Sequence, residues 1–433
     1  RRSYSWDRYS LINRLAHKLP FYYGWVILFA AGDAMFVRNA AASLTLAVFI
    51  FPISDDLGWS RTLIAGAASL GGLVAAVTSP IVGWASDRYG VRVILTVSVI
   101  ALGISTFSLA WATFPIAFYL AFGMSRVLFS SSFAVGPSVA ISRWFVRRRG
   151  RATGVLFLSH SLGMITFPLV AGLVITYWSW QAAWMVLGVI VWVAALGPVA
   201  LFIRQSPESL GLTPDIPQER KEEKSQVETA PAEEPNWTLG DARRTPTLWL
   251  LALATGMLFL MQAGTNTHQG AYFIDQGLGV AISALAISFN AAFTGIGSLV
   301  WGWLVERVPV RYCYAAVALV MVLSLFLFPS VTTIWQALLI ASLWGTSVGG
   351  ILVVPAVAYA DYFGRQSIGV IRGVTEPFVG LGQAVGAIFS GLVFDVSGSY
   401  HLAFITLGMV GVGTIGLILL AKPPQLRATP AAA

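Results

Sequence analysis

Long apolar runs alternate with short polar breaks along almost the whole chain. Because a helix that crosses a membrane needs about 20 mostly apolar residues, this pattern predicts twelve spanning helices. Their expected ranges are 22–50, 62–84, 91–112, 115–141, 150–176, 180–203, 247–274, 281–304, 311–329, 334–360, 367–394 and 400–421. The first run is too long for a straight crossing, so we expect it to tilt, bend or protrude. The predicted fold class is an all-α polytopic membrane protein.

One long polar segment, residues 204–246, divides the apolar runs into six and six. It contains the charged run 219–224 and then an Ala/Pro/Glu stretch that ends at Pro235. Such a composition is typical of a mobile linker. The predicted domains are an N-terminal segment (1–21), a six-helix bundle (22–203), the linker (204–246), a second six-helix bundle (247–421) and a C-terminal tail (422–433).

The overall composition agrees with a membrane location. Hydrophobic residues make up 57% of the chain and charged residues only 11%, whereas soluble proteins carry about 25% charged residues. The lipid bilayer is therefore the expected surroundings. The single cysteine, Cys313, can form no internal disulfide and has no zinc-type spacing. We expect it to be an apolar packing residue, and we expect no metal and no cofactor.

The basic residues occur almost entirely in every second loop, so they lie on one side of the predicted membrane. Of 27 Lys and Arg, 24 fall on one side, in the two terminal segments, the linker, and the loops and adjoining span ends of that side, which include Arg365 and Arg372. Only Arg61 falls on the opposite side, while Arg38 and Arg126 lie inside spans. Because positive charge collects on the cytoplasmic side, both termini and the linker should be cytoplasmic. A nucleic-acid surface would not follow loop parity, so no nucleic-acid partner is expected.

Two loop motifs repeat with the same internal spacing, 219 residues apart. Their members are Gly83, Asp87, Arg88 and Arg92 in the first copy, and Gly302, Glu306, Arg307 and Arg311 in the second. Pro137 and Pro355 follow at nearly the same offset. Duplication of a six-helix unit explains this repetition.

At these motifs the chain resembles the major facilitator superfamily, whose loop pattern is Gly-x-x-x-Asp-Arg-x-Gly-Arg-Arg; the first copy departs from it only at Val91. Arg126 fits the family's conserved arginine position in the fourth span. The resemblance implies two six-helix bundles, a substrate site at mid-membrane and alternating access. Stretches 23–25, 57–61, 144–154, 362–365 and 394–400 look closest to the monocarboxylate and oxalate/formate branch. However, Ser298 stands where many monocarboxylate carriers have an arginine.

The eight motif residues are interpreted as a conformational latch at the cytoplasmic ends of the helices. A carboxylate there can accept hydrogen bonds from an arginine or from the N-terminus of a neighbouring helix, and glycine allows helices to approach closely. The alternative is plain surface charge that follows the positive-inside rule.

Ionisable residues inside the spans are candidates for substrate binding or coupling, because they are costly in lipid and usually face a cavity or a partner. They are Asp33, Arg38, Arg126, His160, His268 and Glu376. An arginine cannot readily lose its proton, so Arg126 must pair with an anion, either a substrate or a side chain such as Asp33. Arg38 is a candidate for binding an anionic substrate, and Asp33 for carrying a proton.

The other candidates are less specific. Glu376 precedes Pro377 and can bind a proton, pair with Arg372 or cap a helix break. The two histidines are candidate proton sites because their ordinary pKa is about 6.5, although a buried histidine bonded to a hydroxyl is the common case. A polar stripe on the seventh span and two further amides form a possible second half of the site, or else hydrogen bonds between helices: Gln262, Asn266, Gln269, Asn290 and Gln383.

These features predict a secondary transporter of a small organic solute, preferably an organic anion, with coupling to protons or to a counter-substrate. The alternatives are a proton-coupled exporter of drugs or metabolites and a transporter-like solute sensor. The sequence has no nucleophile elbow, metal cluster or Walker loop, so an enzyme is not expected. We expect a monomer to be functional, in the inner or plasma membrane.

Overall fold

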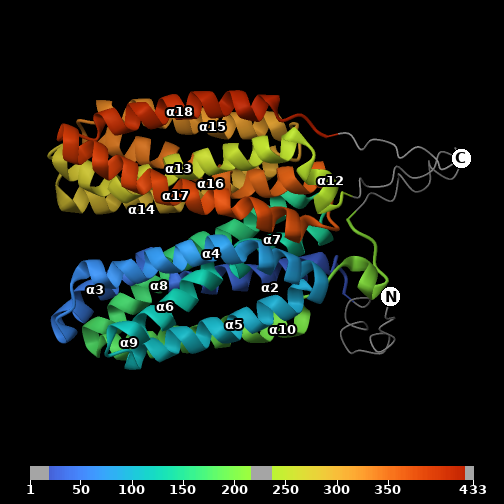
Figure 1. Cartoon of the computed structure of the whole chain (residues 1–433), viewed down its shortest axis with the longest axis horizontal. Helices are drawn as coiled ribbons and strands as arrows, with labels where there is room; N and C mark the ends of the chain where they lie inside the picture. The colour runs from blue at the N-terminus through green and yellow to red at the C-terminus, as the bar shows by residue number, and fades with distance from the viewer. Residues whose placement is uncertain (1–18, 216–236, 425–433) are drawn as a thin grey trace, which may run out of the picture.

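The computed structural model describes residues 19–215 and 237–424 (Figure 1). The first residues of the predicted N-terminal segment, the charged part of the linker and the end of the predicted tail lie outside the described residues. The prediction of a mobile linker therefore concerns residues that are mostly outside this description.

The first half of the chain is helical throughout. Its helices are α2 (Gly24–Val37), α3 (Ser43–Leu57), α4 (Arg61–Tyr89), α5 (Val91–Ser108), α6 (Pro115–Ser130), α7 (Ser132–Trp144), α8 (Arg149–Tyr177), α9 (Trp180–Val191) and α10 (Gly197–Phe202). A 3-10 helix, η2 (Arg38–Ala41), joins α2 to α3. A π-helical turn, Trp192–Leu196, joins α9 to α10.

The second half contains a short helix, α12 (Leu239–Arg243), and six long helices. These are α13 (Pro246–Asp275), α14 (Gly279–Leu304), α15 (Val310–Leu327), α16 (Ile334–Phe363), α17 (Ile368–Ser397) and α18 (His401–Leu420). Eleven helical segments in the described ranges are long and apolar enough to cross a membrane. The 29-residue α4 lies alongside them in the position of the second predicted span (Figure 1). The all-helical fold class is confirmed.

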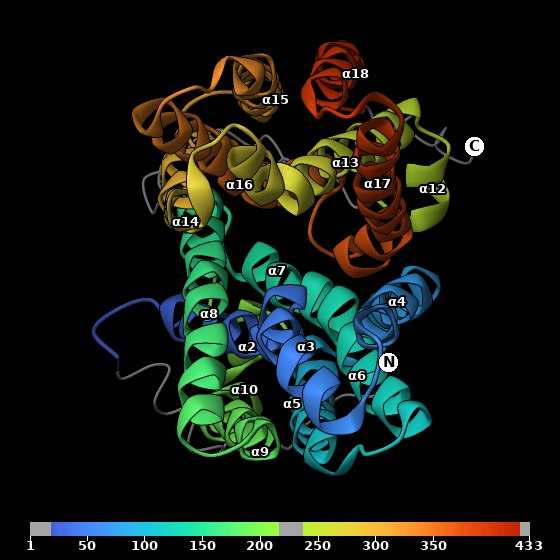
Figure 2. The ribbon, with the colours of Figure 1, turned by 90° about the vertical axis from the view of Figure 1, so that its left-hand side faces the viewer.

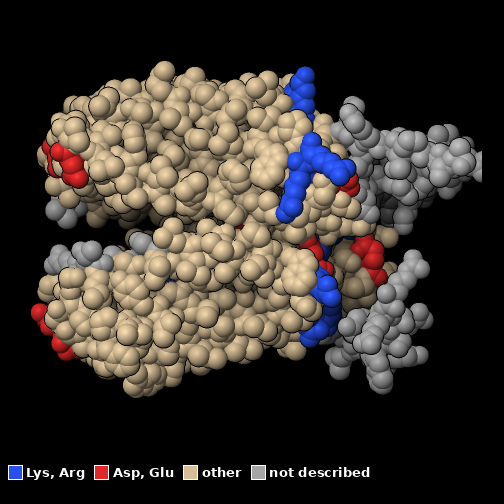
Figure 3. Space-filling view, viewed as in Figure 1, with Lys and Arg blue, Asp and Glu red and all other residues tan. Residues whose placement is uncertain are grey.

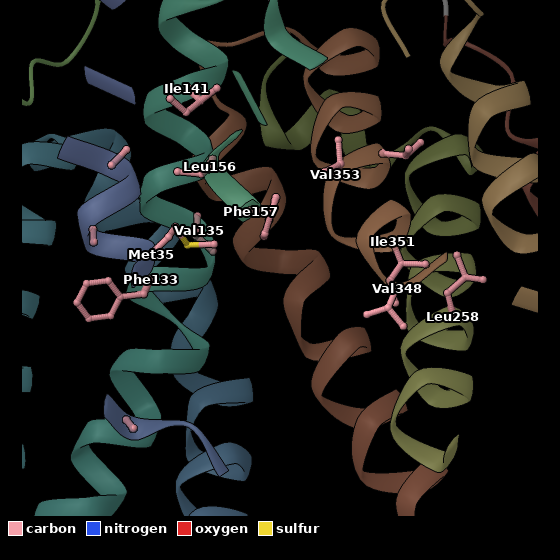
Figure 4. Close-up of a cluster of buried hydrophobic side chains, with 14 of the residues drawn as sticks. Met35, Phe133, Val135, Ile141, Leu156, Phe157, Leu258, Val348, Ile351 and Val353 are labelled. Atoms are coloured by element: carbon pink, nitrogen blue, oxygen red, sulfur yellow. The ribbon is translucent and has the colours of Figure 1, made fainter. Parts of the chain in front are cut away.

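The helices form two groups, α2 to α10 and α12 to α18 (Figure 2). Buried apolar side chains of both groups belong to one core cluster, and Figure 4 shows part of it, with Met35, Phe133 and Phe157 from the first half and Leu258 and Ile351 from the second. The packed interior therefore continues from one half into the other. The halves meet where α4 lies against α17 and where α8 lies against α14.

Two spans of the first half are broken near their middle. The first span changes from α2 to η2 at Arg38 and becomes extended at Ala42, with ψ 148°. The fourth span breaks at Ser131, with φ −111° and ψ −78°, between α6 and α7. The expected bend of the first span is confirmed. Such breaks leave backbone groups without helical partners, and inside a membrane these groups need other partners.

The charges lie at the two ends of the molecule. In Figure 3, Lys and Arg lie near the end where the termini are found, Asp and Glu occur at both ends, and an uncharged surface separates the ends. An uncharged band with basic residues on one side is the arrangement expected of a protein that spans a bilayer.

Candidate functional site

Two arginines, Arg38 and Arg126, form hydrogen bonds that link the broken first and fourth spans. Arg38 Nη1 donates to the Phe133 carbonyl at 3.3 Å, which has no helical partner because Pro137, four residues later, lacks an N–H. Arg126 Nη1 donates to the Ala41 carbonyl at 3.2 Å, in the break of the first span. Each arginine therefore binds an unpaired carbonyl of the other broken span.

A single aromatic ring lies against both arginines. The Cζ atoms of Arg38 and Arg126 are 4.0 Å and 4.6 Å from the centroid of the Phe129 ring, within the range of a cation–π interaction. The Nε atom of each arginine is buried and has no hydrogen-bond partner among residues 19–215 and 237–424. The ion pairs found in these ranges include neither arginine, so the alternative of a permanent salt bridge from Arg126 to Asp33 is not what the structure shows.

His160 lies beside this cluster and is tied to the first break. Asn39 Nδ2 donates to the carbonyls of Met35 and His160, at 3.1 Å and 3.0 Å, and lies 3.1 Å from His160 Nδ1. The Asn39 carbonyl accepts from the Thr45 hydroxyl at 2.7 Å. The His160 ring centroid is 6.4 Å from that of Phe129. This places the buried histidine next to the arginines and fixes the break against α8.

The opposite half faces the arginines with an ion pair. Arg372 Nη2 donates to Glu376 Oε1 at 2.9 Å, and the two side chains are only 11% and 12% exposed. Arg38 interacts electrostatically with Arg126, Glu376 and Arg372, so the pair lies across the interface from the first-half arginines. Of the three roles considered for Glu376, the structure shows pairing with Arg372.

Arg372 was counted with the basic residues of one side, although it falls inside the predicted eleventh span (367–394), and the structure bears out that span. This arginine lies one turn inside α17, which begins at Ile368, and its side chain is buried at the interface between the halves. Its spacing of four residues from Glu376 places both side chains on one face of a helix. That spacing was the available signal that Arg372 belongs with the buried charges.

The polar stripe of the seventh span takes part in hydrogen bonds between helices. Asn290 Nδ2 donates to Asn266 Oδ1 at 3.2 Å and to Gln269 Oε1 at 3.3 Å. Trp344 Nε1 also donates to Asn266 Oδ1, at 2.7 Å. This network joins α13, α14 and α16, as the alternative reading of the stripe expects. Gln262, which is half-buried, and Gln383, which is exposed, take no part in it.

Two further candidates lie apart from the arginines. His268 Nε2 is 2.9 Å from the Ala387 carbonyl and its Nδ1 is 3.3 Å from the Tyr400 hydroxyl, so it fastens α13 to α17 and α18. One carboxylate oxygen of Asp33, Oδ2, is buried and unpartnered in the described part of the chain. No ion pair joins Asp33 to a basic residue there.

The two motif carboxylates connect the halves at the end that carries the termini. Asp87 Oδ1 accepts from Arg143 Nη2 at 2.6 Å, and Asp87 Oδ2 accepts from the Val370 N–H at 2.7 Å, near the N-terminus of α17. Glu306 accepts from the Arg151 N–H and from Arg151 Nε, both at 2.8 Å. Each carboxylate thus caps a helix of the opposite half.

The motif glycines lie at the same crossings, and the motif arginines do not. Gly83 approaches the backbone of α17, and Gly302 approaches the backbone of α8. The arginines make contacts within their own halves: Arg88 with Trp84, Arg92 with the Ala200 carbonyl, Arg307 with Trp303, and Arg311 with Tyr312. A direct link between halves therefore involves the acids and glycines. Motif reasoning missed the basic partners of these acids, Arg143 and Arg151. It also missed the ion pair between Arg149 of α8 and Asp361 of α16, which joins the halves as well.

Comparisons with known proteins agree with this architecture. The model of the Major Facilitator Superfamily matches residues 29–378 and 284–433. The chain is 27% identical to the membrane sensor protein UhpC of Salmonella typhimurium over 82% of this chain and 79% of UhpC. It is 23% identical to monocarboxylate transporter 11 of Mus musculus, over 88% and 84% of the two chains.

Among solved structures, the fold is similar to that of the human organic anion transporter MFSD10. The TM-score is 0.70, the sequence identity is 12%, and the match covers 91% of this chain and 99% of MFSD10. At this identity the match shows a shared fold. Together with the family match over most of the sequence, it establishes that the chain belongs to the major facilitator superfamily of multi-pass membrane transporters, and that it is not an enzyme.

Proposed function

We propose that the protein is a secondary transporter of an organic anion, which works by alternating access between the bundles formed by residues 22–203 and 247–421. One observation carries the proposal: Arg38 and Arg126 are inside the spans and have no carboxylate partner in the described ranges. By contrast, the buried Arg143, Arg149 and Arg372 each pair with a carboxylate. Buried arginines stay charged and need a countercharge. An anionic substrate supplies it.

The proposed orientation places the termini in the cytoplasm, since basic residues gather at that end. The carboxylate links of Asp87 and Glu306 close this end, while the halves separate at the opposite end (Figure 3). We therefore assign the structure to a state that is closed toward the cytoplasm and open outward. Transport requires these links to break while contacts form at the other end.

Coupling to protons or to a counter-anion is part of the proposal. His160 and Glu376 are the candidate proton carriers nearest to the arginines, and Asp33 is a third candidate inside the first span. The similarity to the organic anion transporter MFSD10 and to monocarboxylate transporter 11 supports an anion rather than a hydrophobic cation as the substrate. We therefore propose an anion carrier in preference to a drug exporter.

A solute sensor is the second candidate function, because UhpC is described as a membrane sensor and matches 82% of this chain. A sensor of this kind binds an anion at the same arginines but does not move it. Binding alone therefore does not separate the two functions, whereas flux does.

The test uses purified protein in proteoliposomes and a panel of labelled carboxylates and phosphate esters. Arg38→Gln and Arg126→Gln should each lower uptake at least about tenfold, since one buried charge partner of the anion is worth about 1.5–3 kcal/mol. The exposed Arg243 of α12 provides the matched control, Arg243→Gln, which should behave as wild type. Uptake by both variants with wild-type affinity would refute the proposal. Saturable binding without flux would establish the sensor instead.

A further inference from the structure

We propose that the site binds a divalent oxyanion and that Arg372, from the second half, is its third ligand beside Arg38 and Arg126. The inference rests on the proposed function and makes it more specific. It concerns the charge of the substrate and the way in which one ligand joins the two halves.

The first support is a set of unused hydrogen-bond donors. Arg372 gives one nitrogen to Glu376, yet its Nε and Nη1 are buried and lack partners among residues 19–215 and 237–424. The Nε atoms of Arg38 and Arg126 are likewise buried and lack hydrogen-bond partners in these ranges. Buried donors without partners are costly, and more so when they are charged. Four such nitrogens, on three spans and both halves, indicate a ligand with several acceptor oxygens.

The second support is the balance of charge. Arg38 interacts with Arg126, Arg372 and Glu376, so three positive charges and one negative charge lie together and leave two positive charges uncompensated. A monovalent anion leaves one of these buried, whereas a divalent anion cancels both. Because an uncompensated buried charge costs several kcal/mol, the site should prefer the divalent ligand. Asp33 does not alter the balance, since no contact joins it to these arginines in the described ranges.

Guanidinium geometry favours oxyanions in particular. The planar fork of an arginine matches two oxygens of a phosphate or carboxylate group. The Phe129 ring packs against the guanidinium groups of Arg38 and Arg126. This contact orients both guanidinium planes, so their unpartnered N–H groups are already positioned for a ligand. Phosphate monoesters and dicarboxylates share the required chemistry, two negative charges on clustered oxygens, and separate arms of the test distinguish them.

Placement on both halves gives Arg372 a specific role. Arg38 and Arg126 belong to the first half, and Arg372 belongs to α17 of the second. Without a ligand, the Glu376 carboxylate offsets the repulsion between Arg372 and the first-half arginines. A divalent anion bound by arginines of both halves adds attraction between them, so bound anion should draw the halves together.

The experiment compares matched ligand pairs on the detergent-purified full chain by isothermal titration calorimetry. Methyl phosphate and dimethyl phosphate differ by one methyl group, and at pH 8 the first is mostly divalent because the second pKa of a phosphate monoester is about 6. Malonate and monomethyl malonate form the dicarboxylate arm. In at least one arm, the divalent member should bind at least tenfold more tightly to wild-type protein. The arm with the stronger preference identifies the oxyanion.

Arg372→Gln should reduce the preference for the divalent member about tenfold, whereas the control Arg243→Gln should keep the wild-type preference. Arg372→Lys keeps the positive charge and should retain most of the preference. The lysine variant therefore keeps the test valid if the glutamine variant folds poorly. Equal binding of both members in both arms would overturn the inference but leave anion transport standing. An unchanged preference in folded Arg372→Gln would also overturn it. The absence of any anion binding or uptake would refute the proposed function itself.

Discussion

Pro137→Ala tests whether the crossed breaks position the site. The Phe133 carbonyl accepts from Arg38 at 3.3 Å because Pro137 has no N–H to donate to it. Alanine supplies this N–H and lets α7 form its regular bond to the same carbonyl. The substitution removes no hydrogen-bonding group, yet it should weaken the hydrogen bond that positions Arg38.

The magnitude follows from the geometry of the bond. Hydrogen bonds to charged groups contribute about 1.5–3 kcal/mol, and a distance of 3.3 Å is long for an N–H···O bond. The lower value therefore applies, and about 1.4 kcal/mol corresponds to a tenfold change in affinity. The restored helix bond offsets the loss for folding. Anion affinity should consequently fall about tenfold while the thermal stability of the empty protein stays the same or rises.

The assay is anion affinity by calorimetry together with the thermal midpoint of the empty protein. Pro355→Ala is the matched control, because Pro355 lies inside α16 at the equivalent place of the repeat. No arginine donates to the Ile351 carbonyl, four residues earlier, in the described part of the chain. The control should change affinity less than about threefold. Equal affinities of the two variants would refute the reasoning that connects the break to the site.

Two further predictions concern the end that carries the termini. Asp87→Asn removes the charged acceptor of the Val370 N–H, the bond by which Asp87 links the halves, and a hydrogen bond to a charged group is worth about 1.5–3 kcal/mol; the closed state should therefore lose population about tenfold or more, seen as longer spin-label distances between the halves, with little change in anion affinity. For Glu208, burial raises the pKa, but hydrogen bonds from Ser206 and its own N–H and the charge of Arg365 outweigh burial and hold the pKa below the ordinary 4.5. Its stabilising contribution is therefore present at neutral pH and is lost as pH falls below that value. Because the Glu208 side chain is 52% exposed, Glu208→Gln should lower the unfolding free energy by less than about 1 kcal/mol at pH 7 and by a smaller amount in acid, below the ordinary pKa of the carboxyl; an equal loss at neutral and acid pH would contradict this.

The fold was predictable because apolar length alone identifies a spanning helix. The last span was expected at 400–421, and α18 covers His401–Leu420. The largest error at an end was in the first span, which was expected to finish at residue 50 and continues in α3 to Leu57. Pro52 and polar residues follow the predicted end, but the helix continues and ends only where Gly58 adopts φ 68°, a left-handed conformation suited to glycine.

The site was only partly predictable. Arg38 and Arg126 stood out because a charge within an apolar run is rare and costly. Arg372 did not, since it is near the start of a span and was counted among the basic residues of the side that carries the termini. The breaks at Arg38 and Ser131 carry no proline or glycine, and the bonds that stabilise them come from the other span. Such reciprocal contacts depend on tertiary packing, which one sequence does not reveal.

The two halves share a repeat but not a mechanism. In the first half both central spans are broken and carry the arginines, while α13 and α16, their counterparts, are unbroken helices of 30 residues joined by the uncharged Asn266 network. On the proposed function, charge recognition belongs mainly to the half with broken spans, and Arg372, which pairs with Glu376, is the proposed contact of the other half with the anion. A bound anion would then add attraction between the halves that the empty site lacks. Movement of the halves should therefore depend on the charge of the ligand rather than on its shape alone.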